Sequence, residues 1–189
     1  ANEGEKPFIR QNLSQKADFY KEGRSLVAYL PTGYYTTPGE YSIEYGIENG
    51  ETYKKVIKVR SRDFHIQYLT VDEEIESSTH SDEANIEYAK YFTPVRQQSN
   101  NESYYTEEFI VPTKGRLSTE FGETRYVNGS PTYYHHSGLD IAADTGTPVY
   151  ATNRGKVVLA RHLIMTGNTI VIDHGCGLFS VYFHLDKLL

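Results

Sequence analysis

Strand-length apolar runs separated by tight-turn residues constrain the fold of this chain more than any other feature. Apolar residues alternate over Glu40–Ile47, Asn49-Gly50 follows, and a second run returns over Thr52–Val59. A period of two is typical of a half-buried strand, and Asn-Gly is a strong hairpin signal. The 17 tyrosines also favour strands. The pattern predicts a mainly all-β protein, and no apolar run approaches the roughly 20 residues of a transmembrane segment.

The first half is expected to form an accessory domain over residues 25–104, after a polar N-terminal tail at 1–24. Four strand candidates with tight turns predict an immunoglobulin-like β-sandwich: 25–30, 40–47, 52–59 and 65–71. The acidic stretch 72–85 is predicted to be a loop. Ser81 is a candidate N-cap for a short helix over 82–91, and Pro94 follows its expected end. The polar segment 97–103 predicts a linker, with the domain boundary near residue 104.

The second half, residues 105–189, contains no helix-length periodic segment. Short apolar runs bounded by Gly, Pro and Asn predict seven strands: 107–111, 116–121, 139–142, 148–151, 156–160, 168–172 and 179–183. Asn128-Gly129 predicts a further hairpin. We therefore expect a twisted, mainly antiparallel β domain here.

Charge and cysteine content exclude several functions. The chain has 25 acidic residues against 19 Lys and Arg, for a net charge of −6, whereas nucleic-acid binding depends on clustered basic residues. No nucleic-acid partner is expected. The single cysteine, Cys176, excludes an intramolecular disulfide framework and a Cys-rich zinc site.

Histidines gather in the second half, where five of the seven lie: His135, His136, His162, His174 and His184. With no cysteine set available, imidazole and carboxylate are the donors left for a metal. His136 and Asp140 have the spacing His-x-x-x-Asp, and Gly138 between them lets the backbone bend. The spacing alone favours a solvated loop histidine and a turn aspartate over a metal site.

Three blocks in this half, in order, resemble lysostaphin/LytM-type zinc metallopeptidases, which cut peptide bonds in bacterial peptidoglycan. The first runs from His136-Ser-Gly-Leu-Asp140 to Ala151, and the second is Gly167-Asn-Thr-Ile-Val-Ile-Asp-His174-Gly. The third is Tyr182-Phe-His184-Leu185. The resemblance covers about residues 107–189 and implies a β-sheet metallopeptidase domain.

The resemblance makes His136 and Asp140 zinc ligands and His184 a catalytic histidine. In this family a later His-x-His element supplies a second catalytic histidine and the third zinc ligand. That element is not among the 189 residues, so we expect a domain that is incomplete at its C-terminus. The implied activity is zinc-dependent hydrolysis of peptidoglycan peptide crosslinks by an exported, extracellular or cell-envelope enzyme. The oligomeric state stays open.

A second function and several other candidate residues fit parts of the sequence. A degenerate peptidase-fold module could bind the cell wall or regulate another wall hydrolase without catalysis. Ser180 and Cys176 lack a nucleophile elbow or a recognisable paired histidine in the sequence, so both are predicted to be structural. We also expect structural or surface roles for His135, His162, His174 and Asp186.

Overall fold

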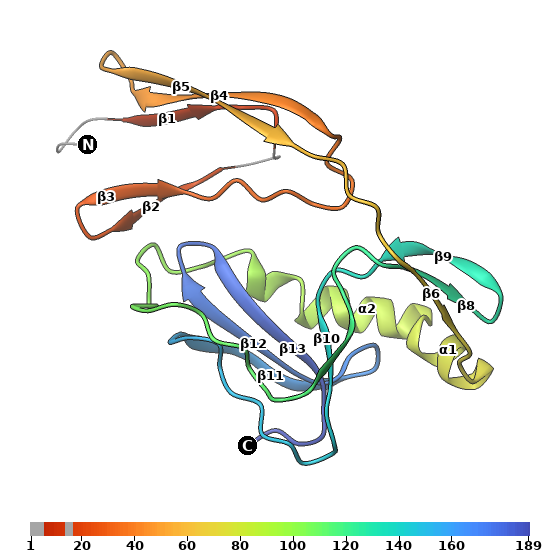
Figure 1. Cartoon of the computed structure of the whole chain (residues 1–189). Coiled ribbons are helices and arrows are strands. Elements are labelled where there is room, and N and C mark those ends of the chain that lie inside the picture. The colour runs from red at the N-terminus through yellow and green to blue at the C-terminus, as the bar shows by residue number, and fades with distance from the viewer. Residues whose placement is uncertain (1–5, 14–16) are drawn as a thin grey trace. The chain divides into compact units, whose positions relative to one another are not determined.

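The computed structural model describes residues 6–13 and 17–189 and divides into two compact units, Ala1–Asp63 and Phe64–Leu189. Strands predominate in both, as the arrows in Figure 1 show. This confirms the predicted mainly-β class. No helix among the described residues is long and apolar enough to cross a membrane.

The first unit contains two small antiparallel sheets. One has the order β1-β4-β5, formed by Pro7–Arg10, Gly39–Ile47 and Thr52–Val59. The other is the hairpin of β2 (Phe19–Glu22) and β3 (Ser25–Ala28). Asn49 has φ 61° in the β4–β5 turn, the left-handed conformation that Asn-Gly hairpin turns require. The predicted β4–β5 hairpin is therefore correct.

The predicted N-terminal tail was wrong in its described part, because β1 and β2 lie within residues 1–24. β1 pairs with β4 over the register Pro7↔Ile47 to Arg10↔Glu44. A four-residue strand is stabilised by pairing with its partner strand. It is too short to show a clear alternation of apolar residues in a polar segment, so the sequence did not predict it. The immunoglobulin-like topology stays a prediction. The fourth strand expected for it, at 65–71, corresponds to β6 (Ile66–Leu69), which pairs within the second unit.

The boundary between the compact units also differs from the one expected near residue 104. β6 (Ile66–Leu69) pairs in parallel with β8 (Thr124–Val127), so this strand belongs to the second unit. β8 forms a hairpin with β9 (Ser130–His135), and Asn128 and Gly129 in its turn have φ 51° and 81°. A parallel pair joined by a long connection leaves no local turn signal in the sequence.

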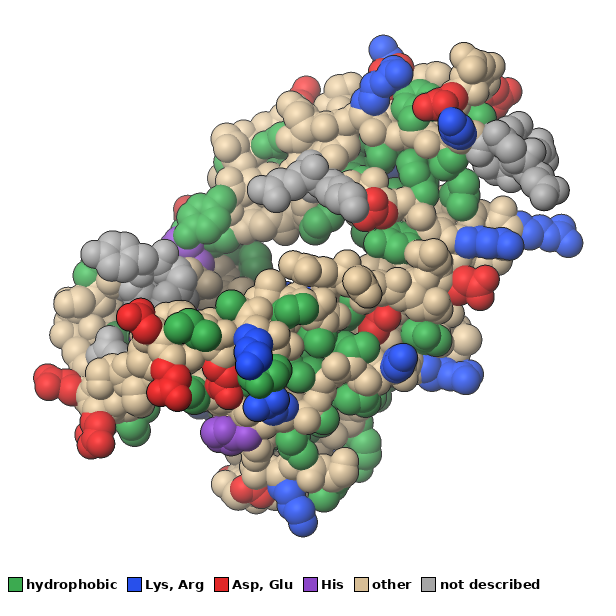
Figure 2. Space-filling view, turned by 180° about the vertical axis from the view of Figure 1, so that it is seen from behind, with side chains coloured by type: hydrophobic (Ala, Val, Ile, Leu, Met, Phe, Trp, Pro, Cys, Tyr) green, Lys and Arg blue, Asp and Glu red, His purple; other side chains and the backbone are tan. Residues whose placement is uncertain are grey.

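Helices occupy the segment between β6 and β7. The predicted helix is present as α2 (Asp82–Tyr91), with the Ser81 side chain accepting from the Ala84 N–H. The predicted loop at 72–85 instead contains α1 (Glu73–Thr79), which Asp72 caps by accepting from the Glu74 N–H at 2.9 Å. Acidic side chains gather over the end of this unit where α1 lies (Figure 2). A 3₁₀ turn at Pro94–Arg96 follows α2.

The core of the second unit lies between α2 and a three-stranded antiparallel sheet. This sheet has the order β11-β12-β13, formed by Lys156–Leu163, Gly167–Gly175 and Leu178–Leu185. Phe92, Leu163 and Val171 form the buried cluster, and Tyr88 packs against it. Burial of apolar surface from both layers stabilises this arrangement.

A two-stranded sheet of β7 (Arg116–Thr119) and β10 (Asp140–Ala142) completes the unit. The strands predicted at 107–111 and 148–151 are absent, although both segments are described. Each segment makes an isolated backbone bond to a residue next to the other, such as that from the Ile110 N–H to the Thr152 carbonyl at 2.9 Å. Apolar runs of this length therefore did not by themselves produce a ladder.

Candidate metal site

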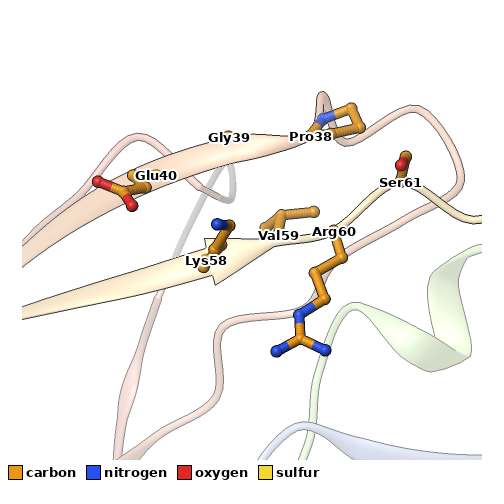
Figure 3. A pocket seen from close by; sticks show the side chains of 7 residues that line it. All are labelled: Pro38, Gly39, Glu40, Lys58, Val59, Arg60 and Ser61. Atoms are coloured by element: carbon orange, nitrogen blue, oxygen red, sulfur yellow. The ribbon is translucent and has the colours of Figure 1, made fainter.

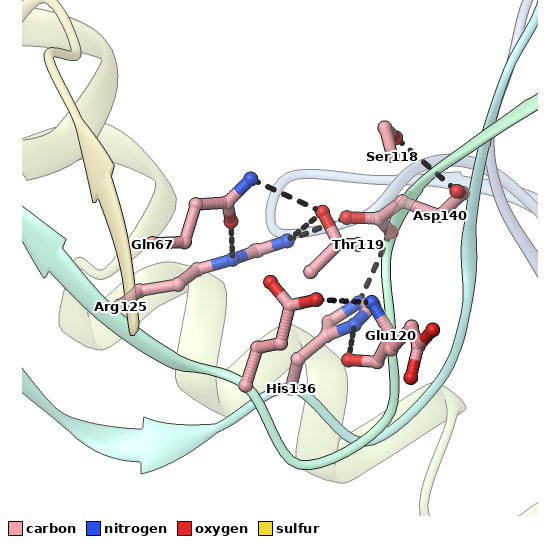
Figure 4. Close-up of polar contacts among 8 residues, drawn as sticks. Gln67, Ser118, Thr119, Glu120, Arg125, His136 and Asp140 are labelled. Carbon is pink, nitrogen blue, oxygen red and sulfur yellow. Dashed lines mark hydrogen bonds and ion pairs between the residues drawn. The ribbon is translucent and has the colours of Figure 1, made fainter. Parts of the chain in front are cut away.

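His136 and Asp140 lie at the two ends of the connection between β9 and β10, and their side chains meet (Figure 4). The His136 Nε2 atom is 3.0 Å from Asp140 Oδ1. The His136 side chain is 15% exposed and the Asp140 side chain 43%. The structure thus brings together the two residues that the spacing singled out.

An irregularity in the β7–β10 pairing determines the position of Asp140. Asp140 pairs with Thr119 and Ile141 with Leu117, so Ser118 is an extra residue on β7. The Ser118 hydroxyl donates to the Asp140 carbonyl at 3.1 Å. Bulges of this kind change the direction of neighbouring side chains and occur often beside functional sites.

The loop after β7 fixes the tautomer of His136. The His136 Nδ1 atom lies 3.2 Å from the Glu120 carbonyl oxygen. The His136 backbone N–H donates to the Glu123 carbonyl at 2.9 Å, and the Gly122 N–H donates to the His136 carbonyl at 2.7 Å. Because a carbonyl only accepts, Nδ1 carries the hydrogen and donates it.

The two facing atoms of the pair could hold a cation between them. In neutral His136 the Nε2 atom presents a lone pair to Asp140 Oδ1, and two acceptors 3.0 Å apart need a proton or a metal ion between them. A backbone carbonyl on the second ring nitrogen is the usual support of a metal-bound histidine. The donor set of one imidazole and one carboxylate fits zinc. Within residues 6–13 and 17–189, no three or more His, Cys, Asp or Glu side chains lie close enough together to hold a metal ion.

Arg125 on β8 also contacts the carboxylate of Asp140. Its Nη2 atom lies 2.5 Å from Asp140 Oδ2, and its Nε donates to Gln67 Oε1 at 3.1 Å. The sequence analysis missed both residues. Arginine is common on strands, and Gln67 is distant in sequence, so no local pattern connected them with Asp140.

His184 lies on β13, and no described contact joins it to His136 or Asp140. Asn168 pairs with Leu185 and Ile170 with Tyr182, so Phe183 and His184 together oppose one residue on β12. His184 is exposed and has φ 55°, and its N–H donates to the Thr166 carbonyl at 2.9 Å. A non-glycine residue held at positive φ at a bulge is a feature of functional sites. Its catalytic role stays a prediction.

His174 and Ser180 belong to a buried hydrogen-bond network that the sequence did not reveal. The His174 Nδ1 atom is 2.7 Å from the Arg154 carbonyl and its Nε2 atom is 2.7 Å from Ser180 Oγ. Ser180 Oγ also bonds to the Tyr182 hydroxyl at 2.9 Å. His174 is 0% exposed. The other weighed histidines lie elsewhere: His135 bonds to Thr124 Oγ1 at 3.0 Å, and His162 is exposed.

A separate pocket of about 710 Å³ lies in the first unit, between β4 and β5 (Figure 3). Glu40 is its single carboxylate, beside the cationic side chains of Lys58 and Arg60. One carboxylate without imidazole is no metal site.

Comparison with known proteins finds similarity to one peptidase family in part of the chain. The model of peptidase family M23 matches residues 134–189, the segment that contains His136, Asp140 and His184. This segment is similar to M23 peptidases. A crystal structure of a putative peptidase M23 from Pseudomonas aeruginosa is similar with a TM-score of 0.63 and 25% identity. The match covers 95% of this chain and 68% of that one, and it confirms the predicted resemblance.

Two kinds of curated protein are similar to parts of this chain. The chain is 36% identical over 83 residues to the peptidoglycan DD-endopeptidase ShyA of Vibrio cholerae, covering 44% of this chain and 19% of ShyA. It is 34% identical over 79 residues to the murein hydrolase activator NlpD of Escherichia coli, covering 41% of this chain and 19% of NlpD. The chain therefore spans about a fifth of the length of these relatives.

Proposed function

We propose that this protein is a zinc-dependent endopeptidase that hydrolyses peptide crosslinks of bacterial peptidoglycan in the cell envelope. The observation that carries the proposal is the His136–Asp140 pair, with a lone pair on Nε2 and a carboxylate oxygen 3.0 Å apart. The M23 match to residues 134–189 and the similarity to ShyA support it.

His136 and Asp140 would hold the metal through Nε2 and Oδ1. Zinc in such a site lowers the pKa of its bound water to about 7 and polarises the scissile carbonyl. The Glu120 carbonyl keeps the hydrogen of His136 on Nδ1, so the electron pair of Nε2 stays available to the metal. His184 is proposed to hydrogen-bond to the developing oxyanion or to the attacking water.

Catalytic zinc sites use three protein ligands, and the described residues bring two together. We propose that a further histidine completes the ligand set. For this reason the test uses the gene product as the cell makes it.

The alternative function is a non-catalytic module that binds the cell wall or regulates another wall hydrolase. The similarity to the activator NlpD favours it, at 34% identity. The two functions differ in one respect that is directly measurable, because only the endopeptidase creates new peptide termini.

The experiment incubates purified peptidoglycan with the zinc-loaded gene product and identifies released fragments by mass spectrometry. The endopeptidase predicts fragments with new amino termini, which disappear on treatment with a chelator and return on adding zinc. The matched control is His162→Ala, an exposed histidine outside the site, which should cleave like the wild type. Binding to peptidoglycan without new termini would contradict the enzymatic function and support the alternative.

A further inference from the structure

The two carboxylate oxygens of Asp140 have different partners. Oδ1 faces His136 Nε2 at 3.0 Å, whereas Oδ2 accepts from Arg125 Nη2 at 2.5 Å. Figure 4 shows the imidazole and the guanidinium approaching the carboxylate separately. A charge-assisted hydrogen bond of this kind is about twice as strong as a neutral one. Arg125 therefore occupies one oxygen and leaves the other for the cation site.

Arg125 is itself held in place from two strands. Gln67 Oε1 on β6 accepts from Arg125 Nε at 3.1 Å, and Gln67 Nε2 donates to Thr119 Oγ1 at 3.3 Å. Arg125 Nη2 also donates to Thr119 Oγ1 at 3.5 Å. Gln67 and Arg125 are direct partners in the parallel β6–β8 pair. Thr119 is 2% exposed and pairs with Asp140, so the support is part of the sheet framework.

We propose that Arg125 is a positioning residue of the metal site, which restricts Asp140 to one-oxygen coordination, and that Gln67 holds Arg125 for this task. The inference rests on the proposed zinc site. Arg125 suits the role because its guanidinium is permanently charged and bonds through a rigid fork. With Oδ2 held by Arg125, rotation of the carboxylate toward two-oxygen coordination would break that hydrogen bond.

Arg125 could also act in the opposite direction, as a positive charge that repels a divalent cation. The two roles predict opposite changes in zinc affinity when the charge of Arg125 is removed. A purely repulsive charge makes zinc bind more tightly once it is removed, whereas a positioning residue makes zinc bind more weakly. Loss of an outer hydrogen-bond partner of a metal ligand typically lowers metal affinity about 10–100-fold. We expect a loss in this range.

The experiment measures the dissociation constant of zinc by competition with a chromophoric chelator, on the uninterrupted gene product. The variants are Arg125→Met, Gln67→Leu and Gln67→Glu. Arg116→Met is the matched control, because Arg116 is an exposed arginine on β7 that takes no part in the network. Absorption of the cobalt-substituted proteins reports the geometry of coordination, and thermal unfolding of the metal-free proteins reports folding.

The account predicts that Arg125→Met weakens zinc binding about 10–100-fold and changes the cobalt spectrum. Gln67→Leu should weaken binding in the same direction, although it touches neither ligand. Gln67→Glu should retain the affinity, because it keeps an acceptor for Arg125 Nε. The double variant Arg125→Met/Gln67→Leu should lose no more than Arg125→Met alone.

The outcomes separate this inference from the proposed function. A wild-type protein that binds zinc no better than its His136→Ala variant would overturn both. Zinc binding by the wild type that is unchanged or tighter in Arg125→Met would overturn the positioning role alone. If Arg125→Met fails to fold, an unchanged zinc affinity in Gln67→Leu would overturn the positioning role instead.

Discussion

The Nε2 atom of His174 lies 2.7 Å from the Oγ atom of Ser180, within the distance of a nucleophile–base pair. Two features indicate that this contact has a structural rather than a catalytic role. His174 is fully buried, and its Nδ1 atom bonds to the Arg154 carbonyl. Ser180 also bonds to the Tyr182 hydroxyl, which receives the Thr152 N–H at 2.8 Å. The network joins β13 to the segment before β11.

Ser180→Ala should therefore destabilise the protein without abolishing hydrolysis. Removal of the hydroxyl leaves His174 Nε2 and the Tyr182 hydroxyl short of one partner each, at a cost of about 1–3 kcal/mol. Urea unfolding checks the stability, and release of peptidoglycan fragments checks the activity. A folded Ser180→Ala protein without activity would contradict the structural role and point to a serine nucleophile.

Asp173 should be among the most important polar residues for folding. Its carboxylate accepts from Ser99 Oγ at 2.6 Å, from the Asn100 N–H at 3.0 Å and from the Gly175 N–H at 2.8 Å. Asp173 is 4% exposed. Asp173→Ala leaves these donors unpaired, so we expect a loss of about 2–4 kcal/mol in the free energy of unfolding.

The control for Asp173 is Asp186→Ala, at an exposed aspartate, which should change stability by less than about 0.5 kcal/mol. Urea unfolding of the two variants gives the comparison. Equal stabilities would show that the bonds from residues 99 and 100 to β12 contribute nothing.

Tyr88 should make the protein less stable at alkaline pH. Burial raises the pKa of Tyr88 in the folded protein, and the positive charge of Arg96 offsets part of this rise. The unfolded chain ionises its tyrosines near pH 10. The contribution of Tyr88 is therefore fully present below that pH and is lost as pH rises through the folded-state pKa.

Tyr88→Phe should then reduce the fall in stability above about pH 10, because the new side chain does not ionise. The ring still stacks on Phe92, whose centroid lies 4.3 Å away. Chemical unfolding at several pH values between 8 and 11 measures the slope. Identical slopes for both proteins would contradict the assignment to Tyr88.

His184→Ala should separate metal binding from turnover. In the proposed function His184 contacts the reacting groups rather than the metal, so zinc affinity should stay within about threefold while kcat falls about 10²–10⁴-fold. Metal analysis and fragment release on the same preparation make the comparison. Loss of zinc from this variant would make His184 a ligand, and full activity would remove it from the mechanism.

Local signals predicted the elements that depend on neighbouring residues. Ser81 ahead of Asp82–Tyr91 marked α2 because an N-cap acts within one turn. Asn49-Gly50 marked the β4–β5 hairpin because the turn conformation requires such residues. The His-x-x-x-Asp spacing predicted the contact between His136 and Asp140 in the same way, since only three residues separate them.

Long-range contacts could not be predicted in this way. β6 pairs in parallel with β8, so Gln67 meets Arg125 although the two are 58 positions apart in the sequence. The bulges beside Asp140 and His184 depend on strand register, which hydrophobic pattern alone does not determine when strands are short. For this reason the sequence indicated the candidate ligands His136 and Asp140 but neither Arg125 nor the support it receives.

The most direct test of the central claim is anomalous diffraction at the zinc absorption edge from crystals of the zinc-loaded gene product. The account predicts one anomalous peak bonded to His136 Nε2 and Asp140 Oδ1 at about 2.0–2.2 Å, with Arg125 still on Oδ2. A peak bonded to other residues, or crystals with bound zinc in which His136 and Asp140 point apart, would contradict it.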